Sequence, residues 1–372
     1  MEYREIKKLS ANPSLLGFGC MRFPKKEDGT IDEQEAEKMI DYAMEKGVTY
    51  IDTAYPYHDG DSEPFVGRVL KKYPRDRFYL ATKMPVWKVE SLEDAKNVFE
   101  EQLQRLDVDY VDFYLLHALN KERWDNLVKL GLIEFCEELK KQGKIKYLGF
   151  SFHDEYPVFE EILTYRDWDF CQIQLNYIDT DIQAGLKGYE LTKERNVPLV
   201  IMEPIKGGAL ANLPEDIRSM FEKGNSNRSL SSWALRYVAS LDNVKVVLSG
   251  MSTFDQVKDN LDTFNHFEPL SPKELSLVED VAKAIKARTK NGCTGCAYCM
   301  PCPFGVNIPG NFKIWNEYAM YGNVETTKKR YHDLGDGARA DQCKQCGACE
   351  KMCPQAIAIR EDLKRVVQDM PK

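Results

Sequence analysis

Eight of the eleven cysteines lie within the last eighty residues, in two short runs. The first run has the spacing Cys-x2-Cys-x2-Cys-x2-Cys-Pro, and the second has Cys-x2-Cys-x2-Cys-x3-Cys-Pro. Clustered thiols in a chain without an export signal indicate metal coordination rather than disulfides. The cysteines of the two runs are Cys293, Cys296, Cys299 and Cys302, followed by Cys343, Cys346, Cys349 and Cys353.

The last cysteine of each run directly precedes proline. Three thiolates spaced three residues apart can hold three corners of one cubane cluster, and in two-cluster ferredoxins the fourth cysteine ligates the other cluster. The second run matches that bacterial spacing in full, whereas the first has one residue fewer before Cys302. The sequence therefore predicts two [4Fe-4S] clusters with crossed ligands. One cluster would bind Cys293, Cys296, Cys299 and Cys353, and the other Cys343, Cys346, Cys349 and Cys302.

Zinc is the alternative metal, because four-thiolate zinc sites also use Cys-x2-Cys pairs. Zinc ribbons present two separated pairs, and two triplets that each end in Cys-Pro match that arrangement poorly. A brown protein with acid-labile sulfide would support the clusters, whereas a colourless protein with stoichiometric zinc would exclude them. The other cysteines, Cys20, Cys136 and Cys171, are expected to pack in the core.

A second set of polar residues lies in the first third of the chain. Asp52, Lys83 and His117 each end an apolar run, and Tyr57 follows Asp52 by five residues. A free tyrosine titrates near pH ~10, and a nearby ammonium group such as that of Lys83 makes its proton easier to donate. Asp52 can hold Lys83 in place, and His117 can donate a hydrogen bond to a carbonyl oxygen. Together these groups can polarise a carbonyl and protonate its oxygen as a hydride arrives.

Such residues need a scaffold that brings strand ends together. From about residue 11 to residue 265, eight apolar runs rich in β-forming residues alternate with helical patterns. Near-continuous apolar runs are typical of parallel strands buried on both faces, and eight strand–helix units over about 250 residues indicate a (β/α)8 barrel with its active site at the C-terminal strand ends. A doubly wound sheet is the alternative, but no G-x-G-x-x-G follows the first run. The runs are residues 15–21, 49–54, 78–83, 111–117, 147–152, 170–176, 198–203 and 244–250.

The alternation stops after residue 265. Ser271 and Pro272 can begin one more helix, which would run to about residue 288. We therefore expect a barrel domain at residues 1–288 and a mostly helical, ferredoxin-like iron–sulfur domain at residues 289–372. Within the barrel, the charge-rich segments 32–46 and 126–142 are expected to form helices on the solvated outer face.

The motif GVTYIDTA at residues 47–54, followed by Tyr57, resembles the second-strand signature of the aldo-keto reductase family. Lys83 in Ala-Thr-Lys and His117 in Leu-Leu-His complete that family's Asp-Tyr-Lys-His tetrad, whose Asp is Asp52. The resemblance covers about residues 1–265. It implies a (β/α)8 barrel that binds NADP or NAD without a Rossmann domain. It also implies hydride transfer to a small aldehyde or ketone, with Tyr57 as the general acid.

The resemblance also implies contacts with the cofactor and the substrate. Ser151 and Gln172 would bind the nicotinamide carboxamide, although Phe152 stands where the family usually has Asn. Gly250 and Gln256 fall where many members have cations for the 2′-phosphate, so the choice between NADPH and NADH is open. The other cofactor residues would be Met202 in place of a stacking tyrosine, Lys206 and Gly207 near the pyrophosphate, and Asn260 near the adenine. Met21 and Trp87 would line the substrate pocket.

Length and charge exclude several classes of protein. The chain has 372 residues and a formal net charge of −8, which argues against a nucleic-acid-binding surface. No stretch of about 18 apolar residues is present, so we expect no membrane span. The first residues lack the apolar core of a signal peptide, and the protein is therefore expected in the cytoplasm.

The two sites move electrons in different numbers. A hydride carries two electrons and a cluster moves one, so a flavin normally stands between nicotinamide and an iron–sulfur centre. One interpretation is a carbonyl reductase whose clusters serve electron transfer, structure or the docking of a redox protein partner. The alternative is an iron–sulfur electron-transfer enzyme that uses a flavin or a redox partner at the barrel site. A redox sensor on an inactive barrel is a third interpretation, which the complete tetrad argues against.

Overall fold

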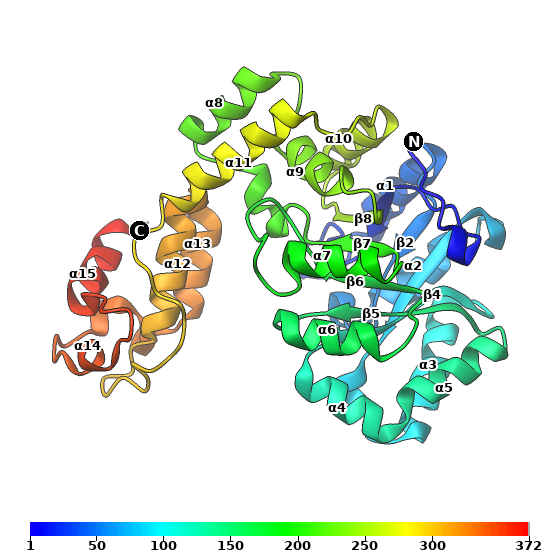
Figure 1. The fold of residues 1–372 in the computed structure, drawn as a ribbon, viewed down its shortest axis with the longest axis horizontal. Helices are drawn as coiled ribbons and strands as arrows, with labels where there is room; N and C mark the ends of the chain where they lie inside the picture. Colours follow the sequence, from blue (N-terminus) through cyan, green and yellow to red (C-terminus); the bar gives the residue numbers. More distant parts are fainter. Residues whose placement is uncertain (371–372) are drawn as a thin grey trace. The chain divides into compact units, whose positions relative to one another are not determined.

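The computed structural model describes residues 1–370 (Figure 1). Within these residues, eight parallel strands form a closed barrel in sequence order, and β8 pairs with β1. The predicted (β/α)8 barrel is therefore confirmed. The strands are β1 (Leu16–Gly19), β2 (Tyr50–Asp52), β3 (Tyr79–Met84), β4 (Val111–Leu119), β5 (Ile145–Phe152), β6 (Phe170–Gln174), β7 (Leu199–Met202) and β8 (Val244–Gly250).

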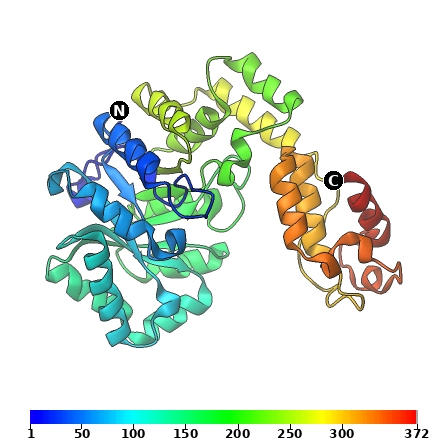
Figure 2. The ribbon, with the colours of Figure 1, turned by 180° about the vertical axis from the view of Figure 1, so that it is seen from behind.

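Helices alternate with these strands and lie around the outside of the barrel (Figures 1 and 2). The helix α1, for example, buries an apolar stripe that includes Met39, Ile40 and Ala43, and Asp32 caps its first turn. The single helix expected at 126–142 is wrong, because Gly131 at φ +73° ends α4 and precedes α5. These helices are α1 (Glu33–Glu45), α2 (Ser62–Leu70), α3 (Leu92–Leu106), α4 (Lys121–Leu130), α5 (Leu132–Lys141), α6 (Tyr156–Tyr165), α7 (Gly185–Glu194), α9 (Leu230–Ala239) and α10 (Phe254–Asn265).

Alternate strand residues fall into two separate hydrophobic clusters. Ile51 and Tyr114 belong to the large cluster that also contains helix residues, whereas Tyr50 and Phe113 belong to a second one. Successive side chains of a strand point to opposite faces, so the second cluster lies on the inner side of the barrel. Asp52 follows Tyr50 by two residues, and its side chain therefore also points inward.

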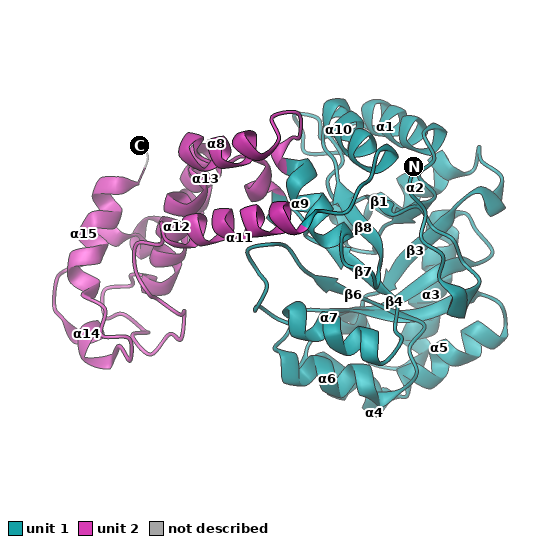
Figure 3. Ribbon diagram, turned by 45° about the horizontal axis from the view of Figure 1, so that its top comes forward, with its two compact units in different colours: residues 1–207, 231–271 teal, residues 208–230, 272–372 magenta. Residues whose placement is uncertain are grey.

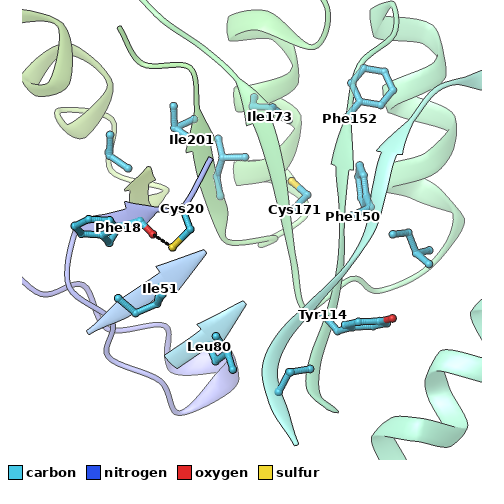
Figure 4. Close-up of a cluster of buried hydrophobic side chains, with 14 of the residues drawn as sticks. Phe18, Cys20, Ile51, Leu80, Tyr114, Phe150, Phe152, Cys171, Ile173 and Ile201 are labelled. Carbon is cyan, nitrogen blue, oxygen red and sulfur yellow. Dashed lines mark hydrogen bonds between the residues drawn. The ribbon is translucent and has the colours of Figure 1, made fainter. Parts of the chain in front are cut away.

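The three isolated cysteines lie in the large cluster. Cys20, Cys136 and Cys171 are fully buried, and Figure 4 shows Cys20 and Cys171 among aliphatic and aromatic side chains. The thiol of Cys20 donates to the carbonyl oxygen of Phe18 at 3.8 Å. Burial in such apolar surroundings is the packing role expected of these cysteines.

The chain divides into two compact units (Figure 3). The first comprises residues 1–207 and 231–271, and the second comprises residues 208–230 with those from 272 onwards. This division differs from the boundary expected near residue 289, because α11 (Pro272–Lys286) packs with α8 (Glu215–Gly224) in the second unit. A division into compact units does not test a domain boundary, so the boundary at 288/289 stays a prediction from sequence.

The second unit is helical and surrounds a small core of its own. Phe312, Trp315 and Leu363 belong to this core, and six of the eight clustered cysteines, all except Cys296 and Cys346, pack against it. None of the helices in residues 1–370 is both long enough and apolar enough to cross a membrane. Besides α8 and α11, the helices of this unit are α12 (Ile308–Tyr321), α13 (Val324–Asp333), α14 (Ala348–Met352) and α15 (Ile359–Asp369).

Candidate functional site

Three polar residues lie at the C-terminal ends of neighbouring strands, with side chains that point into the barrel. Asp52 ends β2, Lys83 lies near the end of β3, and His117 lies near the end of β4. The backbone N–H of Tyr57 donates to the carbonyl oxygen of Ala54, and this turn begins the short 3-10 helix η2 (Tyr57–Gly60). The turn returns Tyr57 to the barrel opening, so all four residues expected to act together are neighbours.

The Lys83 ammonium is the centre of this group. It donates to Asp52 Oδ1 at 2.6 Å, to the carbonyl oxygen of Thr53 at 2.7 Å and to the Tyr57 hydroxyl at 3.3 Å. Lys83 and Asp52 are 1% and 2% exposed. An ammonium has three donors, and all three have oxygen partners here, so its position relative to the Tyr57 hydroxyl is fixed.

The charges of the site follow from burial and from these contacts. Burial works to lower the pKa of Lys83, but Asp52 and Tyr57 raise it and on balance it lies above its ordinary value. Burial raises the pKa of Tyr57, and the Lys83 charge offsets only part of that rise. Burial, followed by the charge of Lys83, holds the pKa of His117 well below its usual range. At neutral pH the site therefore holds a charged lysine, a protonated tyrosine and a neutral imidazole.

Tyr57 and His117 line an open cavity together with Met21, Arg22 and His58. Met21 is 53% exposed, and the Trp87 ring lies 5.1 Å from the His117 ring, centroid to centroid. The two residues expected to line the substrate pocket, Met21 and Trp87, are thus near the tetrad. A carbonyl compound in this cavity can reach both the phenol and the imidazole.

The residues expected at the nicotinamide lie on the following three strands, β5, β6 and β7. Gln172 is 1% exposed, and no hydrogen-bond partner of its Oε1 is found within residues 1–370. The Ser151 hydroxyl accepts a hydrogen bond from the Ala118 N–H at 2.7 Å, and Met202 ends β7 half-buried. A buried amide oxygen without a partner suits the N–H groups of a carboxamide, so these residues fit the group expected there.

The residues expected at the far end of the cofactor are engaged differently. The Lys206 ammonium pairs with the buried Asp179 carboxylate at 2.5 Å. The Asn260 amide donates to the Ser249 hydroxyl at 2.8 Å and is 4% exposed. Gly207 has φ +61°, and a Cβ there would meet only the Arg22 guanidinium, at 3.7 Å. The backbone at Gly207 is therefore open, whereas Lys206 and Asn260 already have partners.

Sequence reasoning did not identify two residues beside His117. Ala118 has a left-handed φ of +53°, and Arg123 donates to its carbonyl oxygen at 2.7 Å. A left-handed alanine leaves no mark in the sequence. Asn120 signals the start of α4 as its N-cap, but this local signal does not reveal what Arg123 reaches in space.

The eight clustered cysteines surround two separate cavities. Ile308 lines both cavities, with Phe312 in one and Leu363 in the other. Within residues 1–370, no three His, Cys, Asp or Glu side chains meet closely enough to hold a single metal ion. The structure brings together the crossed quartets that the spacing suggests. Cys293, Cys296, Cys299 and Cys353 line one cavity, and Cys302, Cys343, Cys346 and Cys349 line the other.

With this geometry established, comparison with protein families identifies both parts of the chain. The model of the aldo/keto reductase family matches residues 15–283. The chain belongs to the aldo/keto reductase family. The model of a 4Fe-4S dicluster domain matches residues 292–358, so the expected combination of an aldo-keto reductase with a C-terminal iron–sulfur domain is confirmed.

Individual relatives agree with this assignment. The chain is 37% identical over 149 residues to "Probable aldo-keto reductase 1" of Glycine max, a match that covers 37% of this chain and 41% of the relative. It is 26% identical over 302 residues to "NADH-specific methylglyoxal reductase" of Escherichia coli K12, covering 70% and 91%. The solved holo aldo-keto reductase of Bacillus halodurans superposes with a TM-score of 0.64 at 30% identity, covering 76% and 97%. The predicted aldo-keto reductase-like oxidoreductase is thus confirmed at the level of the family.

Proposed function

We propose that the barrel site reduces a small aldehyde or ketone with NADPH or NADH. The observation that carries this proposal is the Lys83 ammonium, which bonds both Asp52 and Tyr57 beside the cavity lined by His117. The relative named a methylglyoxal reductase gives it further support, because methylglyoxal is a small carbonyl compound.

The nicotinamide cofactor would supply a hydride to the carbonyl carbon. The unpartnered Oε1 of Gln172 suits its carboxamide, Ser151 adds a hydroxyl beside it, and Gly207 leaves its backbone open for close approach. Gly250 and Gln256 offer no cation for a 2′-phosphate, so neither NADPH nor NADH is favoured at those positions.

The chain's own residues provide the proton and orient the substrate. His117, neutral because of its lowered pKa, would donate a hydrogen bond to the carbonyl oxygen. Tyr57 would give its proton to that oxygen as negative charge develops there. The Lys83 ammonium would stabilise the resulting phenolate, and Asp52 would keep Lys83 charged and in place. The open cavity allows solvent to return a proton to Tyr57.

The two cysteine quartets would each hold a [4Fe-4S] cluster, which the matched 4Fe-4S dicluster model supports over zinc. A cluster would supply one-electron transfer or structural support. Cys293, Cys299 and Cys353 pack against the hydrophobic core of the second unit, which favours a contribution to its folding. Thiolate clusters of this kind persist where cysteines stay reduced, so a cytoplasmic location is the one we propose. A redox protein is the corresponding partner for electron transfer.

Replacing Tyr57 by phenylalanine tests the reductase mechanism. Tyr57→Phe removes the proton donor and should lower kcat for a small aldehyde by about 100-fold to 10,000-fold, with the affinity for NAD(P)H unchanged. Tyr55→Phe is the matched control, because the Tyr55 hydroxyl bonds Glu101 at 3.1 Å instead of Lys83. Equal activity in Tyr57→Phe and the control would end the mechanism as stated.

An anaerobic absorption spectrum separates this function from the flavin-dependent alternative. The spectrum of the purified chain shows iron–sulfur clusters and flavin together. Clusters without flavin, alongside carbonyl reduction by NAD(P)H, support the proposal. A stoichiometric flavin would instead support an electron-transfer enzyme.

A further inference from the structure

The backbone directly after His117 is in an unfavourable conformation. Ala118 has a φ of +53°, a left-handed conformation that a residue with a Cβ rarely adopts. The pairing of β4 with β5 shifts register between Leu116 and Leu119, so His117 and Ala118 both lie in this irregular segment. Such a conformation persists only where the surrounding structure holds it.

Two side chains hold Ala118 from opposite directions. The buried Ser151 hydroxyl on β5 accepts a hydrogen bond from the Ala118 N–H, and Arg123 Nη1 donates to the Ala118 carbonyl oxygen, both at 2.7 Å. Arg123 is itself placed by its helix, because Asn120 Oδ1 accepts from the Arg123 backbone N–H at 2.9 Å. Both backbone polar groups of Ala118, the residue after His117, are therefore engaged.

Arg123 also contacts the ring beside His117. Its guanidinium carbon lies 4.9 Å from the centroid of the Trp87 ring, and Trp87 lies 5.1 Å from the His117 ring. A guanidinium stacks well on an indole face. The Arg123 side chain thus contacts both the backbone after His117 and the Trp87 indole beside its ring.

We propose that Arg123 is a positioning residue for His117, which holds the imidazole where it meets the substrate carbonyl. Arg123 acts through Ala118 and Trp87. Its charge is also one of the smaller causes, after burial, Lys83 and His153, of the lowered pKa of His117. The inference rests on the proposed function, because the position of the imidazole affects turnover only if the barrel reduces carbonyls.

Substitution of Arg123 in the full chain provides the kinetic test. Arg123→Gln should lower kcat by tenfold or more, since displacing a catalytic group by about 1 Å can cost about 100-fold, while the Kd for NAD(P)H from nucleotide fluorescence stays unchanged. Arg123→Lys should recover part of the rate, because an ammonium can still donate to Ala118 but has no planar face for Trp87. Lys129→Gln removes an exposed charge from the same helix and should behave as wild type.

A double variant shows whether Arg123 acts through His117. If it does, adding Arg123→Gln to His117→Ala lowers kcat no further than His117→Ala alone. Losses that multiply, or a wild-type kcat in Arg123→Gln, would overturn the inference. If Arg123→Gln does not fold, the same test uses Arg123→Lys, whose smaller loss of kcat should likewise vanish when His117→Ala is already present.

The ring signal of His117 gives a readout that does not depend on turnover. The chain has five histidines, and selective 13C labelling with His117→Ala assigns the signal in question. Arg123→Gln should move it, and Lys129→Gln should leave it in place. An unmoved signal overturns the inference, whereas a moved signal in a protein that reduces no carbonyl overturns the proposed function alone.

Discussion

The barrel site and the cysteine quartets are positioned in different ways. Asp52 and Lys83 extend regular strands, are almost fully buried and lie in a barrel whose main hydrophobic cluster is large. The cysteines lie on loops and helix ends, Cys296 and Cys346 are exposed, and the core beside them is small. A sheet fixes its strand ends through many backbone hydrogen bonds, whereas loops need their ligand to fix them. The barrel should therefore keep its site geometry unaided, and the cysteine region should depend on its clusters.

The largest expected effect breaks the buried ion pair of the barrel. Lys83→Met leaves the Asp52 carboxylate buried without its charged partner, which should lower the free energy of unfolding of the barrel by about 3–5 kcal/mol and abolish carbonyl reduction. Urea unfolding followed by fluorescence measures this change. Lys71→Met breaks the exposed pair with Asp107 and should cost at most about 1 kcal/mol. A Lys83→Met loss no larger than this control would show that the pair is not tightly held.

The second prediction concerns the crossed cysteine quartets. Cys353→Ser and Cys296→Ser should each lower iron from about eight to about four atoms per chain, and their combination should remove no more than either alone. Cys353→Ser combined with Cys346→Ser should remove nearly all the iron. Cys136→Ser, in the barrel core, should leave the iron content unchanged. If Cys353 and Cys346 instead belonged to one cluster, that pair would retain about four iron atoms.

The third prediction measures how far the two regions depend on each other. Cys346→Ser should leave NAD(P)H-dependent carbonyl reduction within about twofold of wild type, because the strand ends keep the tetrad in place without the cluster. The assay uses the soluble, folded variant, with circular dichroism as the control for the barrel. Loss of turnover in a variant with an intact barrel would support electron flow between clusters and barrel.

The smallest expected effect is a pH dependence of stability. Because the pKa of His117 is lowered in the folded protein, the unfolded chain takes up a proton near pH ~6.5 that the folded one resists. His117 should therefore cost stability as pH falls below about 6.5, by up to about 1.4 kcal/mol per pH unit. His117→Gln should reduce this slope relative to wild type in urea titrations between pH 7 and pH 5. Identical slopes would show that His117 is not held neutral.

Much of the barrel site could be predicted from sequence because its signals are local. Apolar runs mark the strands, and Asp52, Lys83 and His117 share the inward parity of Tyr50 and Phe113. Tyr57 follows through a short turn. The break of α4 and α5 at Gly131 escaped prediction, because the helical pattern continues across it and only the positive φ interrupts it.

Contacts between distant segments could not be predicted in the same way. Lys206, expected near the pyrophosphate, pairs with Asp179 in the loop between β6 and α7. Asn260, expected near the adenine, donates a hydrogen bond to the Ser249 hydroxyl on β8. The resemblance to the family suggests a role for each of these residues. The direction of each side chain, however, depends on its partners, which lie in other segments of the chain. The roles of both residues at the cofactor stay predictions.

By itself, the sequence determined the (β/α)8 barrel, the four tetrad positions and the two cysteine runs, because each depends on periodicity or spacing along one segment. Only the tertiary structure decided that Lys83 bonds both Asp52 and Tyr57 and that Arg123 reaches the turn after His117. The physical reason is that these contacts join residues on different strands, loops and helices. Burial and packing fix such distances, and spacing along the chain does not.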